Sequence, residues 1–211
     1  MTGTSGESPL GFERVVFFSD AVFAIVITLL VLDLKVPESP DRLLGQLADE
    51  WPFFLGYLVS FAFIGGVWIA HTGLTRLLDA ADAVFLGLNL ILLLFVSFLP
   101  FTTKLLTTHM VDAGQRVAVV MFGANLTLAG LMSSLLVSYV ARAHELSGGF
   151  DPADLAWLVR QRWAGVALTT LSTVISALLP KAAAVFYLVL SLLLIVQPLW
   201  AMRRRANVFH H

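Results

Sequence analysis

Long apolar stretches bounded by charged residues constrain this chain more than any other feature. Six of them lie between residues 14 and 33, 50 and 76, 82 and 104, 116 and 142, 162 and 181, and 181 and 203. A bilayer core of about 30 Å is crossed by about 20 apolar residues of α-helix, and a helix pairs its backbone amides internally in hydrocarbon. The sequence therefore predicts an all-α membrane protein with six transmembrane helices.

The composition agrees with a multi-pass protein in a lipid bilayer. Of the 211 residues, 58% are hydrophobic and 13% are charged, whereas an ordinary soluble domain has roughly 25% charged residues. The sequence contains no cysteine, which excludes disulfides, zinc–thiolate sites and thiol nucleophiles. A formal net charge of -1 offers no basic surface for nucleic acid.

The chain is expected to form one six-helix membrane domain over residues 14–205. Residues 1–13 contain two acids and no Lys or Arg, which is unlike a secretory signal peptide and predicts a mobile tail. Residues 206–211 form a second short tail, whose His210 and His211 are compatible with the remnant of a purification tag.

The positions of Lys and Arg predict the orientation, because short cytoplasmic loops are enriched in them. With the N-terminus inside, the inner side holds Arg14, Arg76, Arg142, Arg160, Arg162, Arg203, Arg204 and Arg205, and the outer side holds Lys35, Arg42, Lys104, Arg116 and Lys181. Both termini are therefore expected to be cytoplasmic.

Asp20 is a charged residue inside the first apolar stretch and needs a partner there. At 1.5 Å per residue it lies about 9 Å beyond Arg14. Trp68 and His71 near the end of the second stretch, and Asn89 near the start of the third, lie at a similar depth. Charged groups inside membrane helices usually pair with one another, so we expect a polar network in which Asp20 pairs with His71.

This layer has two interpretations. It is either a structural clamp that fixes helix packing, or a proton relay or sensor, because histidine titrates near neutrality. The residues behind Asp20 are apolar and form one helical stripe of Ile25, Thr28 or Leu29, and Leu32. Periodicity alone does not separate a lipid-facing stripe from a functional one.

Two motifs carry a family resemblance. Arg14, Phe18, Ser19 and Asp20 form R-x-x-x-F-S-D at the start of the first predicted helix, and W-x-x-H ends the second. Together with six predicted helices in about 200 residues, they resemble the transmembrane protein 175 family of potassium channels.

The resemblance implies a homotetramer in which the first helix of each subunit lines a central pore. Apolar rings would replace a carbonyl filter: Ile25 as the narrowest, with Leu29 and Leu32 as further layers and Thr28 assisting selectivity. An apolar ring can gate by dewetting, because it offers an ion no substitute for its hydration shell. Arg14, Phe18, Ser19, Asp20, Trp68 and His71 would belong to the network that holds the pore helices, which Asn89 is expected to join.

The predicted function is a potassium-preferring cation channel that conducts K⁺ passively across the plasma membrane of a prokaryote, with monovalent cations as permeant ions and no cofactor. The alternatives are a proton-responsive secondary transporter using Asp20 and His71, and a structural membrane scaffold.

The sequence shows no nucleophile with an oriented base, so an enzyme is not expected. His109 and Asp112 fall short of the three ligands of a catalytic zinc site, so no metal site is expected, and Asn125 is expected to form an interhelical hydrogen bond.

Overall fold

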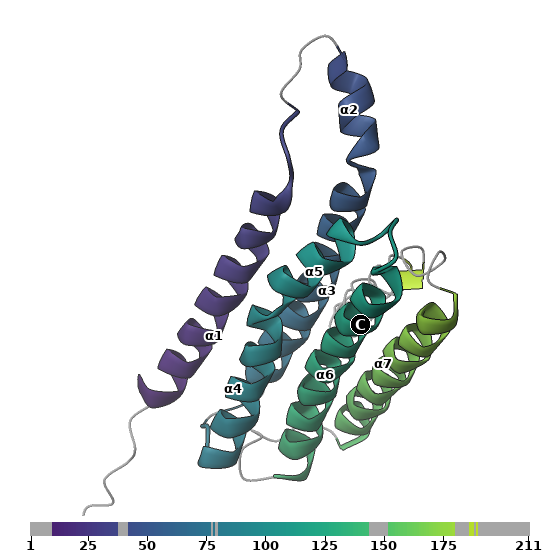
Figure 1. Ribbon diagram of the computed structural model, residues 1–211. Coiled ribbons are helices and arrows are strands. Elements are labelled where there is room, and N and C mark those ends of the chain that lie inside the picture. The colour runs from purple at the N-terminus through teal and green to yellow at the C-terminus, as the bar shows by residue number, and fades with distance from the viewer. Residues whose placement is uncertain are drawn as a thin grey trace, which may run out of the picture.

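The computed structural model is all helical over the residues that it describes, which are 10–37, 42–76, 78, 80–143, 152–179, 186–187 and 189. The helices, in chain order, are α1 (Leu10–Leu29), the 3-10 helix η1 (Leu30–Asp33), α2 (Leu43–Asp49), α3 (Trp51–Thr75), α4 (Ala83–Ser97), α5 (Leu99–Thr108), α6 (Gln115–Arg142) and α7 (Pro152–Leu178). Helices α1 and α7 lie at opposite edges of the bundle, with α3 to α6 between them (Figure 1).

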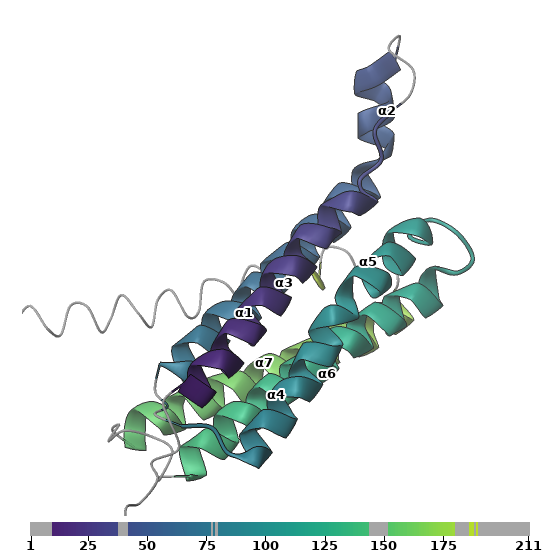
Figure 2. The same cartoon turned by 90° about the vertical axis from the view of Figure 1, so that its left-hand side faces the viewer.

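Helix α1 belongs to one side of this bundle and packs on α3 and α4. Figure 2 shows α1 running alongside α3, and the short helix α2 extending past the end of the bundle. Helix α6 contacts α4, α5 and α7, so it forms the centre of the other side. The result is that α1 is held from one direction only.

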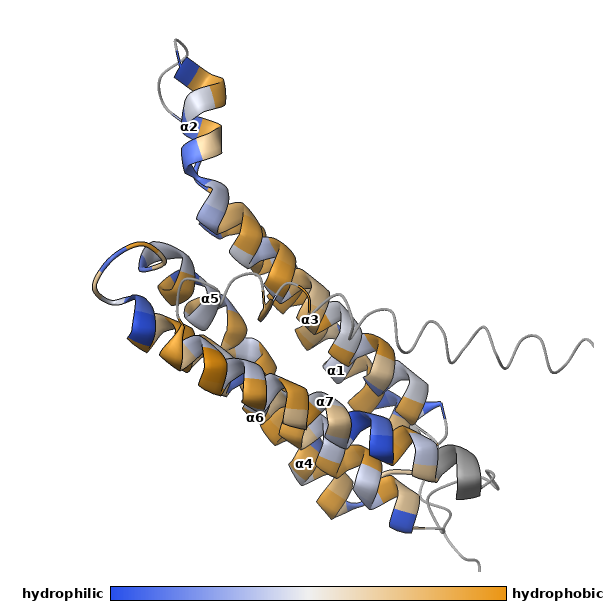
Figure 3. Ribbon diagram, turned by 90° about the vertical axis from the view of Figure 1, so that its right-hand side faces the viewer, coloured by the Kyte–Doolittle hydropathy of each residue, from blue (hydrophilic) through white to orange (hydrophobic). Residues whose placement is uncertain are grey.

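Four helical segments among the described residues are long and apolar enough to cross a membrane. They are Gly11–Asp33, Trp51–Thr75, Ala83–Thr108 and Gln115–Arg142, and they match the first four predicted spans. Hydrophobic residues run along these segments, whereas hydrophilic residues gather at α2 and toward helix ends (Figure 3). The predicted sixth span lies outside the described residues, except for Phe186, Tyr187 and Val189.

Three predicted boundaries were wrong. Helix α1 begins at Leu10, so residues 10–13 extend the helix instead of belonging to a tail. Helix α7 begins at Pro152, ten residues before the predicted fifth stretch, and therefore includes Arg160 and Arg162. The predicted third helix is divided into α4 and α5 at Phe98, because Pro100 has no N–H to donate and its ring clashes with the carbonyl four residues earlier.

Buried polar contacts join α3, α5 and α6 behind this break. The hydroxyls of Ser60 and Thr103 lie 2.7 Å apart, and the Asn125 amide donates to the Thr102 hydroxyl at 3.2 Å. The expected interhelical bond of Asn125 is therefore confirmed. Within the membrane such bonds hold helices together because lipid competes poorly for polar groups.

Candidate functional site

A chain of hydrogen bonds joins α1, α4 and α3 near the end of the bundle where α1 begins. The Asn89 amide Nδ2 donates to Ser19 Oγ at 2.9 Å, and Ser19 Oγ donates to the Val15 carbonyl at 2.9 Å. Asn89 Oδ1 lies 2.9 Å from His71 Nε2. Because a carbonyl oxygen can only accept, Nε2 carries the proton in this arrangement.

The three side chains of this chain are almost completely buried. Ser19, Asn89 and His71 are 0%, 1% and 3% exposed. The imidazole ring packs against the Phe23 ring of α1, with centroids 5.6 Å apart, and His71 Nδ1 has no hydrogen-bond partner among the described residues. One face of α1 is therefore fixed to α3 and α4 by both polar and aromatic contacts.

Asp20 has a different partner from the one predicted. Its Oδ1 accepts a hydrogen bond from the Trp68 indole Nε1–H at 2.9 Å, whereas the polar bond of His71 is to Asn89. The predicted Asp20–His71 pair was therefore wrong. Depth along the helices places all four groups in one layer, but the rotation of each helix decides which of them meet.

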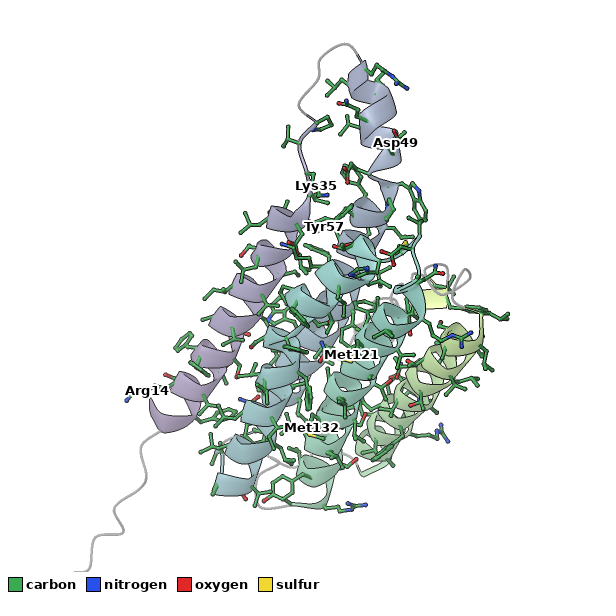
Figure 4. All side chains as sticks on the ribbon, in the orientation of Figure 1. Arg14, Lys35, Asp49, Tyr57, Met121 and Met132 are labelled. Atoms are coloured by element: carbon green, nitrogen blue, oxygen red, sulfur yellow. The ribbon has the colours of Figure 1, made fainter. Side chains whose placement is uncertain are left out.

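Two residues of the first motif lie outside this network. The Arg14 side chain is exposed at the start of α1, and Arg14 and Lys35 lie near opposite ends of the α1–η1 segment (Figure 4). Phe18 is 54% exposed. Within this one subunit the structure brings together Ser19, Asp20, Trp68, His71 and Asn89, and leaves Arg14 and Phe18 on the surface.

The opposite face of α1 is apolar and uncovered. Ile25, Leu29 and Leu32 are 58%, 43% and 74% exposed, and Thr28 is exposed beside them. The Thr28 hydroxyl donates to backbone carbonyls of its own helix. Only 22% of the apolar window of α1 is buried, against 50% in α3 and in α6, so α1 is the least covered of the four segments.

The far end of this helix, at η1, has weaker polar contacts. After η1, Asp33 forms an ion pair with Lys104 of α5 at 3.3 Å, and the Lys104 side chain is 66% exposed. Exposed ion pairs contribute about 0–1 kcal/mol. The Lys35 ammonium lies 4.8 Å from the centre of the Phe53 ring of α3. The directional polar contacts of α1 are therefore concentrated at its beginning, around Ser19 and Asp20, whereas Leu30 of η1, 1% exposed, is held by apolar packing.

The first two apolar segments and most of the third carry the match to the family model. Residues 14–100 match the family model described as endosomal/lysosomal potassium channel TMEM175. This segment includes the whole network and the whole exposed α1 face. A potassium channel of Streptomyces collinus is 35% identical over 180 residues, which are 81% of this chain and 86% of that protein. The chain belongs to the TMEM175 family.

Solved and animal members of the TMEM175 family extend this comparison. The crystal structure of a lysosomal potassium-selective channel TMEM175 homolog from Chamaesiphon minutus matches with a TM-score of 0.76 at 28% identity, over 89% of this chain and 98% of that chain. The endosomal/lysosomal proton channel TMEM175 of Bos taurus is 41% identical over 102 residues, which are 44% of this chain and 21% of that protein.

The TMEM175 comparison confirms the resemblance predicted from the two motifs. The family is one of ion channels, so the prediction that the chain is not an enzyme is also confirmed. Among the described residues there is no group of three or more His, Asp or Glu side chains that could hold a metal ion. His109 Nδ1 and Asp112 Oδ2, 2.7 Å apart, form a local pair between α5 and α6.

Proposed function

We propose that the chain is a potassium-preferring cation channel in which α1 lines the pore. The observation that carries this proposal is the division of α1 into one face fixed to its own subunit and one uncovered face containing Ile25, Thr28, Leu29 and Leu32. The names of the relatives, among them potassium channels of similar length, support it.

A single subunit cannot enclose a pore with one helix face, so the proposal includes a homotetramer around an axis next to α1. In such a ring the side chains of Ile25, Leu29 and Leu32 form successive apolar layers, with Thr28 between them. Apolar constrictions control conduction by excluding water. Ile25 is proposed as the narrowest layer, K⁺ as the permeant ion, and no cofactor takes part.

The proposed topology places both termini in the cytoplasm of a prokaryote and the channel in its plasma membrane. Residues 14–205 form the channel domain in this proposal, with short tails at 1–13, of which 10–13 are helical, and at 206–211. The positive-inside rule supports this orientation, because Arg14, Arg76 and Arg142 follow or precede spans on the same side.

A proton-responsive transporter built on an Asp20–His71 pair receives less support. The carboxylate binds the Trp68 indole and the imidazole binds Asn89, so no direct carboxylate–imidazole bond is available for proton exchange. Purified protein in liposomes with an outward K⁺ gradient tests the choice. A channel dissipates the gradient passively once a protonophore balances the charge, and no K⁺ flux under these conditions would contradict the proposal.

The natural absence of cysteine gives a direct test of the pore face. Ile25→Cys and Leu29→Cys are expected to react with a charged, water-soluble methanethiosulfonate reagent and to lose K⁺ flux on reaction. Ile91→Cys is the matched control, because Ile91 is an exposed apolar residue of a different helix, α4. If all three cysteines are equally protected from the reagent, the exposed α1 face lies in lipid.

A further inference from the structure

A small cavity lies between α3, α6 and α7, at the edge of the bundle away from α1. Its volume is about 30 Å³ and it is partly open to the outside. Phe63 and Val67 of α3 form its apolar wall, and its polar lining includes Ser133 and Ser134 of α6 and Arg162 of α7. The cavity has room for a few oxygen atoms, because one water needs roughly 10–15 Å³ of such space.

Arg162 is a cation with no acidic partner among the described residues. The two ion pairs found there join Lys104 with Asp33 and His109 with Asp112. The sequence itself contains no Asp or Glu after Asp154, so neither the rest of α7 nor the predicted sixth span can supply a carboxylate. An unpaired guanidinium among membrane helices is costly, and an anion in the cavity would remove this cost.

The hydroxyl groups leave room for such an anion. The Ser134 hydroxyl donates to the Gly130 carbonyl at 2.8 Å, and the Thr169 hydroxyl donates to carbonyls of α7. Ser133, 5% exposed, has no such bond within the described part of the chain. Arg162 and Ser133 therefore present the free donors, and a guanidinium fork matches the spacing of two phosphate oxygens.

The surroundings of Arg162 resemble a membrane–water interface. Trp157 and Trp163 lie on the same helix, and each is 41% exposed. Exposed tryptophans gather where lipid headgroups meet the hydrocarbon. The Trp163 indole also donates to Ser138 Oγ of α6 at 3.0 Å, which keeps α7 against the cavity wall. A phosphate carried by a lipid reaches this depth from the bilayer, whereas a free ion would first have to leave water.

We propose that this cavity binds the phosphate of an anionic phospholipid, in the leaflet on the side where α1 and α7 begin. Arg162 holds two phosphate oxygens and Ser133 donates to one of them, while the glycerol and the acyl chains stay outside the cavity, in the bilayer. The site is separate from the pore face of α1, and its occupation does not depend on conduction.

Native mass spectrometry of the detergent-purified oligomer tests this site. Titration with dioleoylphosphatidylglycerol is expected to give retained lipid, and dioleoylphosphatidylcholine less. Arg162→Gln should weaken retention of phosphatidylglycerol about tenfold, because it removes a charge-assisted pair of hydrogen bonds. Arg160→Gln is the matched control: it makes the same change of charge at an exposed position of the same helix and should leave retention unchanged.

Three outcomes would overturn the proposal. Equal weakening of lipid retention by Arg160→Gln and Arg162→Gln would show an effect of general surface charge. Equal retention of the two lipids would show no preference for an anionic headgroup. Displacement of the lipid by millimolar inorganic phosphate would show a site for free anions. If Arg162→Gln does not assemble, Arg162→Lys and Ser133→Ala take its place. Each of these variants should weaken lipid retention by about threefold to tenfold. Unchanged retention in both would also contradict the proposal.

Discussion

The two faces of α1 are built on different chemistry. One face carries Ser19 and Phe23, is buried, and is tied to α3 and α4 through Asn89 and His71. The other carries Ile25 and Leu32, is uncovered, and its one polar side chain, Thr28, bonds only its own helix among the described residues. Directional hydrogen bonds fix how the helix is rotated, and this rotation decides which apolar residues are presented outward.

The largest expected effect comes from wetting the exposed face. Ile25→Asn places an amide in the proposed constriction, where it can hydrogen-bond water and shorten the dry section. We expect passive K⁺ flux in liposomes to rise about tenfold, which corresponds to ~1.4 kcal/mol of barrier. Ile91→Asn on α4 is the control and should leave flux unchanged. Equal flux in the wild type and Ile25→Asn would remove Ile25 from the gate.

The next effect concerns the fixed face. Asn89→Ala removes both bonds of the amide and leaves His71 Nε2 and Ser19 Oγ with one partner fewer. We expect a loss of about 2 kcal/mol in stability, seen as a lower melting temperature in detergent and a lower yield of oligomer. Thr28→Val on the exposed face, where the hydroxyl bonds only its own helix, should melt as the wild type does.

A smaller effect is expected at the edge of the network. Trp68→Phe keeps an aromatic ring but removes the indole donor to Asp20, at a site where Trp68 is 42% exposed. The loss should be about 0.5–1 kcal/mol. Trp163→Phe removes an equivalent donor from α7 and serves as the comparison. Labelling of the cysteine in Ile25→Cys should change with Trp68→Phe and not with Trp163→Phe, since of these two tryptophans only Trp68 bonds to α1.

The smallest effect should depend on pH. Asp82 precedes α4, and the backbone N–H of Phe85, followed by the Tyr139 hydroxyl, lowers the pKa of this carboxyl from its usual 3.8. A lowered pKa means that the stabilisation is fully present above pH 3.8 and is lost as the pH falls through the folded-state value. Asp82→Asn should therefore lower the melting temperature at pH 7, and the difference from wild type should shrink below about pH 4. A difference independent of pH would contradict this role.

Spacing and composition predicted the apolar spans and the depth of the polar layer. Asp20, Trp68, His71 and Asn89 were expected at one level because each lies a similar distance from a charged helix end, and the structure brings them together. The pairing within the layer was wrong, because distance along a helix says nothing about how neighbouring helices are rotated.

The other differences have local causes. The break at Phe98 follows from Pro100. This proline is visible in the sequence, but the continuous apolar run around it favoured the prediction of a single helix. The early start of α7 could not be predicted from hydropathy, since Arg160 and Arg162 interrupt the apolar pattern while remaining good helix formers. The role of the exposed α1 face came from the family resemblance, because an apolar stripe suits lipid and pore equally well.

The polar contacts that set the rotation of α1 lie close to Asp20, at one end of the helix. Along the helix, Ile25 is about 8 Å and Leu32 about 18 Å from Asp20. If the helix tilted about Asp20, each side chain would move in proportion to its distance from that residue, so Leu32 would move more than twice as far as Ile25. Such a tilt would be resisted at the far end by the buried Leu30 and by the exposed ion pair of Asp33 with Lys104.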